Sequence, residues 1–251
     1  MKRELHALVL ALLGGTLLKL AVTGDFQRYV KVGLRPYLAL AAVTVLVVAA
    51  VSLWQAVAQR RAHADVPASA DDHDHDDDGH GHSHGGFDVA WLLVIPMLVL
   101  LLVAPPALGS FSAGRSGTAL GAAPTSDLPP LPEGDPVRLS ILDYASRAVF
   151  DHGHSLQNRQ VALSGFILAG DGGRWYLTRM VITCCAADAQ PIKVGLTGTV
   201  PAGLKANDWI QVTGGYTAEK VDKDPVNGET IPYVSVVSAK PIPAPAQQYE
   251  S

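Results

Sequence analysis

Residues 37–58 read YLALAAVTVLVVAAVSLWQAVA and contain no charged side chain. A bilayer with a hydrocarbon core of about 30 Å is crossed by roughly 20 helical residues, so this run predicts a transmembrane helix. Residues 89–109 are also free of charge, and prolines within that run and at its end are expected to kink or stop the helix. A third run, residues 5–22, carries His6 and Lys19 near its ends, where such side chains reach the headgroups. We therefore predict three spans.

Composition separates a membrane part from a soluble part. Hydrophobic residues make up 48 % of the chain and charged residues 17 %, against about 25 % charge in soluble domains. The excess lies in a predicted membrane domain, 1–109, which is followed by a Gly/Ala/Pro-rich tether, 110–136, and a soluble domain, 137–251. The basic N-terminus before residues 5–22 also fits a signal peptide, but no clear cleavage site follows.

These spans predict a multi-pass protein of the plasma membrane. Basic residues are balanced between the two sides, so charge alone does not fix the orientation. We expect the N-terminus inside, which with three spans leaves the loop 63–86 cytoplasmic and the C-terminal domain extracytoplasmic.

The loop between the second and third predicted spans contains the sequence DDHDHDDDGHGHSH at residues 71–84. Imidazole and carboxylate side chains bind divalent transition metals such as zinc, and glycines let the backbone fold round an ion. The alternating spacing differs from that of a closed zinc finger, so we predict a flexible chelator. The alternative is a solvated acidic linker. The candidate ligands are His73, His75, His80, His82, His84, Asp74 and Asp76.

The soluble part shows the pattern of a small, mostly-β domain. An apolar stripe predicts a short helix over residues 140–150, and five strand-like runs bounded by turn residues follow it. The predicted strands are residues 160–168, 174–183, 192–196, 208–217 and 233–239. Five strands and one helix predict a partly open, OB-like barrel, with a sandwich-like sheet as the alternative. Acidic and basic residues balance in this domain, which argues against nucleic-acid binding.

The most distinctive segment of this domain is RMVITCCAADA at residues 179–189. In a strand, the sulfurs of Cys184 and Cys185 would point to opposite faces, so one closed site using both would need the strand to break there. A thiol facing a cleft could be a metal ligand or a redox-sensitive group, whereas a buried one would be a small core residue. Arg179, Cys184, Cys185 and Asp188 form the second candidate site. A weaker His/Asp cluster occupies residues 151–154.

Taken together, the chain resembles the YcgQ-like family of bacterial membrane proteins, which are described as permease subunits of unknown activity. The matching pieces are the first two apolar runs, residues 100–110 with their Pro-Pro, residues 179–188, Trp209 followed by Val212 and Gly214, and residues 241–249. The resemblance implies a partner, a larger multi-span permease-like protein, and for some members a link to zinc supply. The low-complexity tract, residues 71–84, cannot be aligned, so no metal site is transferred through it.

These features lead to one main hypothesis. We expect a non-enzymatic accessory subunit of a membrane permease that handles divalent transition metal and needs either that partner or a homo-oligomer, because three spans are few for a transport pathway. The alternative is a membrane-anchored scaffold module in which metal plays no part and no cofactor is required. A thiol-dependent enzyme or redox sensor using Cys184 or Cys185 is the weakest hypothesis, because no histidine lies beside the pair in the sequence, although His152 or His154 could approach it in the fold. No phosphate loop, nucleophile elbow or paired-histidine protease motif is present either.

Overall fold

The computed structural model describes residues 2–64, 94–96, 98, 99, 102, 103, 106–120 and 128–250. The chain divides into two compact units. The first contains Met1–Phe26 and Gly33–Pro105, and the second contains Pro106–Ser251 together with the short segment Gln27–Val32. The segment Gln27–Val32, named the docked loop below, therefore belongs with the C-terminal domain although it lies between two N-terminal helices in the sequence.

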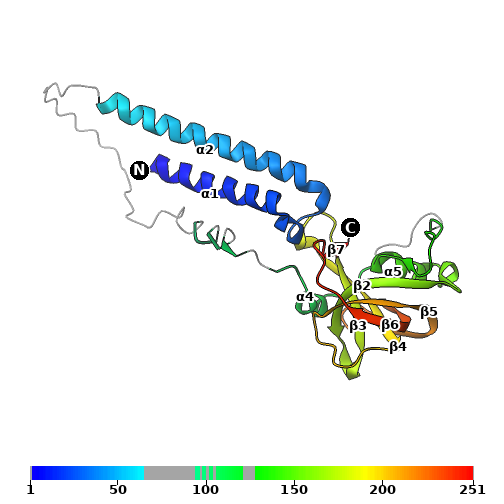
Figure 1. The fold of residues 1–251 in the computed structure, drawn as a ribbon. Helices are drawn as coiled ribbons and strands as arrows, with labels where there is room; N and C mark the ends of the chain where they lie inside the picture. The colour runs from blue at the N-terminus through cyan, green and yellow to red at the C-terminus, as the bar shows by residue number, and fades with distance from the viewer. Residues whose placement is uncertain are drawn as a thin grey trace. The chain divides into compact units, whose positions relative to one another are not determined.

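The first unit is built on two helices, α1 (Lys2–Thr23) and α2 (Arg35–Ala64), which run side by side (Figure 1). Between them lie two short 3-10 turns, η1 (Asp25–Arg28) and η2 (Val32–Leu34). Small residues form the contact between the helices. A Cβ added to Gly14 would lie 2.7 Å from Cγ of Leu46, so only glycine lets α1 approach α2 this closely. Ala7 and Ala21, each seven residues from Gly14, are also buried in α1, and Ala42, Ala49 and Ala56 are buried at intervals of seven in α2.

The large apolar side chains of these helices face outward. Leu40 is 66 % exposed, Val47 is 56 % exposed and Trp54 is 71 % exposed. By length and composition, the described residues contain two candidate membrane spans, His6–Thr23 and Val32–Gln59. The third predicted span, residues 89–109, is described only in part. Of its described residues, 94–96, 98, 99 and 102 are helical, whereas 103 and 106–109 are not.

The second unit is a closed five-stranded β-barrel with one helix packed on it (Figure 1). Each barrel strand pairs with two others, in the cyclic order β2-β5-β6-β4-β3 and back to β2. All pairs are antiparallel except β4 with β6. The strands are β2 (Gln160–Ala169), β3 (Trp175–Val181), β4 (Gln190–Gly198), β5 (Trp209–Lys223) and β6 (Thr230–Pro241).

The barrel was predicted to be partly open, and this part of the prediction is wrong. Strand β2 pairs with β5 through residues 160–166 and then with β3 through residues 166–169, which closes the sheet on itself. The bend falls at Gly165, where an added Cβ would lie 2.6 Å from the carbonyl oxygen of Thr178. A larger residue at this point would push β3 away from β2.

Side chains that alternate along the strands fill the barrel. Leu163, Leu177, Val194, Val212 and Val234 are all fully buried in one core. The helix predicted over residues 140–150 is present as α5 (Ile141–Phe150), with Ser140 as its N-cap accepting from the Asp143 N–H at 2.9 Å. Two short strands complete the sheet: β1 (Val137–Arg138) pairs with β2, and β7 (Tyr249–Glu250) pairs with β3.

Part of the segment predicted as a tether, residues 110–120, packs on the barrel. Helix α4 (Ser110–Arg115) buries Ala113 completely. A buried ion pair then holds the chain after it, with Nζ of Lys193 2.8 Å from Asp224 Oδ2. The same ammonium donates to the carbonyl of Ser116, and Asp224 accepts the N–H of Thr118. Composition alone concealed this contact, because the segment is rich in residues typical of linkers.

Candidate metal centre

The turn between β3 and β4 contains both cysteines of the protein. Strand β3 ends at Val181, and the short 3-10 turn η5 (Ala186–Asp188) begins directly after the cysteines. The carboxylate of Asp188 accepts backbone N–H groups from Thr183 at 2.9 Å, Cys184 at 2.8 Å and Cys185 at 3.3 Å. One side chain thus fixes the backbone of residues 183–188, named the cysteine turn below. The strand was predicted to run to Thr183, but it ends at Val181. The backbone N–H groups of residues 183–185 donate to Asp188 and not to a neighbouring strand.

The end of the strand brings three ligand groups together. The Sγ atoms of Cys184 and Cys185 and a carboxylate oxygen of Asp188 all lie within 4.8 Å of one another. Ligand atoms on one tetrahedral zinc ion lie about 3.8 Å apart, so small side-chain movements would suffice to bind one. Both cysteines are free thiols, and Cys184 is exposed. Two sulfurs and one carboxylate fit zinc or a similar borderline-soft cation, and a fourth position remains for water or another ligand.

Electrostatics within the cysteine turn favours a carboxylate next to a protonated thiol. The hydrogen bond from the Cys184 thiol, joined by the backbone N–H groups of Thr183 and Cys184, lowers the pKa of Asp188 to about 2. The hydrogen bond to Asp188, followed by that to Cys185, raises the pKa of Cys184 to about 11. Cys184 is therefore a poor nucleophile at neutral pH. A bound cation would have to displace its proton, because the thiolate is the metal ligand.

The docked loop binds the backbone of this turn directly. Val30 and Cys185 form an antiparallel bridge. The N–H of Lys31 donates to the carbonyl of Cys184 at 3.0 Å, and the N–H of Ala186 donates to the carbonyl of Tyr29 at 2.7 Å. Both cysteines are thus held by backbone hydrogen bonds to a segment about 150 residues earlier in the chain. Any shift of the docked loop would move the ligand groups.

Arg179, the fourth predicted member of this site, lies elsewhere. Its guanidinium group stands 5.0 Å from the centre of the Trp209 ring and donates to the carbonyl of Gln247 at 3.1 Å. Its Nε atom lies 3.7 Å from Glu250, whose carboxylate accepts the N–H groups of Ile141 and Leu142 at the start of α5. Arg179 therefore ties the C-terminal strand to the barrel and offers no ligand to the cysteine turn.

An open hollow of about 400 Å³ adjoins the cysteine turn. Ala187, Asp188 and Gln190 line one side of it, and Gly117 and Asn227 line the other. Asn227 is held by donating to the carbonyl of Thr118 at 2.9 Å. A small polar molecule could therefore reach Asp188 from this side, next to an ion held by the two sulfurs.

Comparison with known proteins gives two matches along the chain. Residues 5–119 match the DUF1980 N-terminal domain, and residues 144–250 match the DUF1980 C-terminal domain. The chain belongs to the DUF1980 family. No curated protein and no solved structure matches this DUF1980 chain. The family is uncharacterised, so its name assigns no activity, and the kinship with YcgQ-like proteins stays a prediction.

The other predicted ligands of this DUF1980 protein fall into two groups. The histidines and aspartates of the tract, residues 71–84, lie outside the described residues. His152 and His154 are exposed and belong to no comparable ligand group within the described part of the chain. Sequence reasoning missed the docked loop altogether, because its hydrogen bonds to the cysteine turn join backbone atoms and leave no signature in the side chains.

Proposed function

We propose that this protein is a membrane-anchored, non-enzymatic accessory subunit of a permease that handles a divalent transition metal, and that the cysteine turn binds the ion. The observation that carries the proposal is the grouping of two thiols and one carboxylate within 4.8 Å on a turn fixed by backbone hydrogen bonds. Zinc is the ion that this donor set suits best among common cellular metals. The tract of histidines and aspartates, residues 71–84, would be a second and looser chelator.

The arrangement of α1 and α2 supports the membrane anchor. Helices that pack through alanine and glycine while exposing valine, leucine and tryptophan are typical of a bilayer, where lipid covers the large side chains. In water, so large an exposed apolar surface would drive aggregation. Among the exposed residues are Leu40, Val43, Val47, Leu53 and Trp54.

The docked loop supports a particular topology. Because it is hydrogen-bonded to the cysteine turn, it has to lie on the same side of the membrane as the barrel. Helix α1 precedes this loop and α2 follows it, so the far ends of both helices would lie on the opposite side. The chain then has to cross once more before Pro106, which is where the third span was predicted. The tract and the cysteine turn would in this way face opposite compartments.

We infer that the barrel receives the transported metal ion or gates its passage. Five strands, one parallel pair and a Greek-key order are features of the OB class, which we infer for this domain. Two or three spans are too few to enclose a transport pathway alone. We therefore infer a multi-span permease-like partner, with a homo-oligomer as the other route to a complete pathway.

Zinc binding by the purified full-length protein tests the proposal most directly. Competition with a chromogenic zinc indicator would compare the wild type with Cys184→Ser/Cys185→Ser. We expect the double variant to lose the tightest site, with affinity falling more than roughly a hundredfold, since two of three ligands are removed. The tract is intact in both proteins, so the difference reports on the cysteine turn alone.

The matched control is His152→Gln/His154→Gln, which alters two exposed imidazoles outside the ligand group. It should bind zinc as the wild type does. Equal affinity and stoichiometry in the wild type and the double cysteine variant would overturn the metal role and leave the scaffold function as the better account.

The partner and the tract, residues 71–84, are each tested by a separate experiment. Crosslinking and affinity purification from native membranes should recover a multi-span protein in near-stoichiometric amount, whereas recovery of this chain alone would contradict the subunit role. Deletion of residues 71–86 should change metal-dependent uptake if the tract concentrates the ion.

An impermeant thiol reagent applied to intact cells tests the sidedness. The reporters are Gly33→Cys, Lys205→Cys and Arg61→Cys, each in a background lacking both native cysteines; Lys205 is exposed in the C-terminal domain. Gly33 has open space for a side chain, and Arg61 is exposed at the other end of α2. Labelling of Gly33→Cys and Lys205→Cys from one side and of Arg61→Cys from the other is expected.

A further inference from the structure

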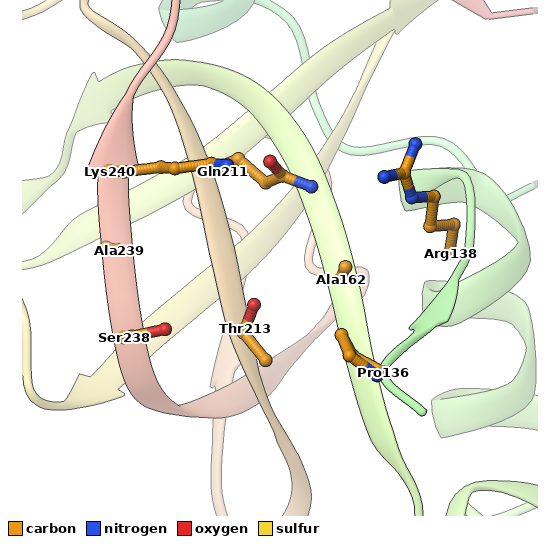
Figure 2. A pocket seen from close by; sticks show the side chains of 8 residues that line it. All are labelled: Pro136, Arg138, Ala162, Gln211, Thr213, Ser238, Ala239 and Lys240. Atoms are coloured by element: carbon orange, nitrogen blue, oxygen red, sulfur yellow. The ribbon is translucent and has the colours of Figure 1, made fainter. Parts of the chain in front are cut away.

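A second hollow, of about 390 Å³, lies on the outer face of the barrel, away from the cysteine turn. It spans β1, β2, β5 and β6, whereas the cysteine turn joins β3 to β4. Figure 2 shows Arg138 on one side of this hollow and Lys240 on the other, with Gln211 between them. Nothing in the metal proposal uses these residues.

Strand register explains why a hollow forms here. Arg138 pairs with Ala162, Ala162 pairs with Thr213, and Thr213 pairs with Ser238, so the four residues form one row across four neighbouring strands. Strands lie about 4.8 Å apart, so Arg138 and Thr213 are separated by roughly 10 Å. Ala162 fills that interval with only a methyl group. Gln211 and Lys240 are paired in the adjacent row and border the same space.

The polar side chains of this hollow are unpaired in the part of the chain that the structure describes. Within the described ranges, the side chains of Arg138, Gln211, Thr213, Ser238 and Lys240 make no hydrogen bond or ion pair. Both charged groups are cations, and no carboxylate lines the space. By contrast, Lys193 is neutralised by Asp224 and Arg174 by Asp222. Unpaired cations, hydroxyls and an amide facing one space suit an anion with several oxygen atoms.

We propose that this hollow, defined by Arg138, Ala162, Gln211, Thr213, Ser238 and Lys240, is a binding site for a phosphate group carried on a small polar molecule. A guanidinium group can bind two phosphate oxygens at once, and an ammonium group adds a point charge from the opposite side. Thr213, Ser238 and Gln211 supply neutral hydrogen bonds to the rest of the ligand. The volume is at the lower end for small-molecule sites and exceeds the needs of a bare ion, so a phosphomonoester or phosphodiester fits best.

Calorimetric titration of the full-length protein, held in nanodiscs of zwitterionic lipid, tests the proposal. The two probes are inorganic phosphate and glycerophosphoglycerol, the soluble headgroup of a common anionic lipid. Arg138→Gln and Lys240→Gln should each lower the affinity about tenfold or more, since each removes a charge-assisted contact. Ala162→Leu should block binding while leaving both charges in place.

The control is Lys205→Gln, which removes an exposed cation outside the hollow and should leave the affinity unchanged. Tighter binding of the phosphodiester would identify a lipid headgroup as the source, and tighter binding of inorganic phosphate would identify a soluble phosphate compound. Absence of saturable binding of both probes at millimolar concentration would overturn the proposal. Equal affinities in the wild type and in Arg138→Gln, with the fold intact by circular dichroism, would overturn it as well.

Discussion

The helical pair and the barrel distribute their side chains in opposite ways. Between α1 and α2 the buried residues are small, such as Gly14 and Ala42, and large residues such as Trp54 face outward. In the barrel the buried residues are large and branched, such as Leu163 and Val212, and polar residues face outward. The first pattern is that of helices in lipid, and the second is that of a domain folded in water.

This contrast indicates that different forces hold the two regions. Burial of apolar area stabilises the barrel, because water surrounds it. In the proposed membrane setting, lipid would offer no such driving force to α1 and α2, and their association would depend on close contact between their backbones. Equivalent substitutions should therefore have very different consequences in the two regions.

The largest effect is expected at the buried ion pair of the barrel. Asp224→Ala would leave the Lys193 ammonium buried without its counter-charge, at a cost of about 3–5 kcal/mol in the free energy of unfolding. Thermal unfolding of the full-length protein in detergent, followed by the strand signal in circular dichroism, would measure it. Lys193→Met/Asp224→Leu should recover most of the loss, and the exposed Glu219→Ala should change little. A loss of less than about 1 kcal/mol in the free energy of unfolding would contradict the burial of the Lys193–Asp224 ion pair.

A matched pair of valines tests the contrast directly. Val212 is fully buried in the barrel, whereas Val47 is 56 % exposed on α2. Val212→Ala should cost about 2.5 kcal/mol, because it loses two methyl groups of burial and leaves a cavity. Val47→Ala should cost less than about 0.5 kcal/mol. Strand and helix signals in the same melting curves would separate the two effects, and similar costs at both sites would contradict the membrane arrangement.

Two adjacent glycines of α1 test the helical contact. An added side chain at Gly14 meets Leu46, while the position of an added Cβ at Gly15 has open space around it. Gly14→Leu should weaken the packing of α1 on α2 by about 2 kcal/mol through overpacking. Gly15→Leu, with the same change in hydrophobicity, should be neutral or slightly stabilising. The concentration of sodium dodecyl sulfate that separates the helices in bicelles is the measure, and identical midpoints would count against the close approach.

The smallest expected effect is on acid stability. Burial by itself raises the pKa of Asp224, but hydrogen bonds from Lys193, Val226 and Thr118 outweigh it and hold the pKa below its ordinary value. Its contribution to stability is therefore present above about pH 4 and is lost as the pH falls through the lower, folded-state pKa. Lys193→Met/Asp224→Leu should therefore lose less stability than the wild type as the pH falls below about 4, because it lacks this titrating carboxylate. Parallel acid titrations of the two proteins would detect the difference.

The sequence predicted elements better than it predicted contacts. Alternating apolar residues around Leu163 and Val212 predicted the strands, and the stripe from Ile141 to Ala148 predicted α5. Closure of the barrel depends on the bend at Gly165, which periodicity does not encode.

In the cysteine turn, residue types and spacing were enough to select Cys184, Cys185 and Asp188. They were not enough to exclude Arg179, because its partner Glu250 is remote in the sequence. The docked loop could not be foreseen, since any sequence can make backbone hydrogen bonds.

One contact of the docked loop also bears on the order of events during synthesis. The Tyr249 hydroxyl, which accepts the N–H of Leu108, donates to the carbonyl of Arg28, a residue made 221 positions earlier. At about 5–20 residues per second, a ribosome needs roughly 10–45 s to cover that interval. During this time α1, α2 and the loop between them have left the ribosome while their partner strand does not yet exist. Under the proposed membrane topology, the helices enter the bilayer first, and the loop between them stays in the aqueous phase until the barrel has formed.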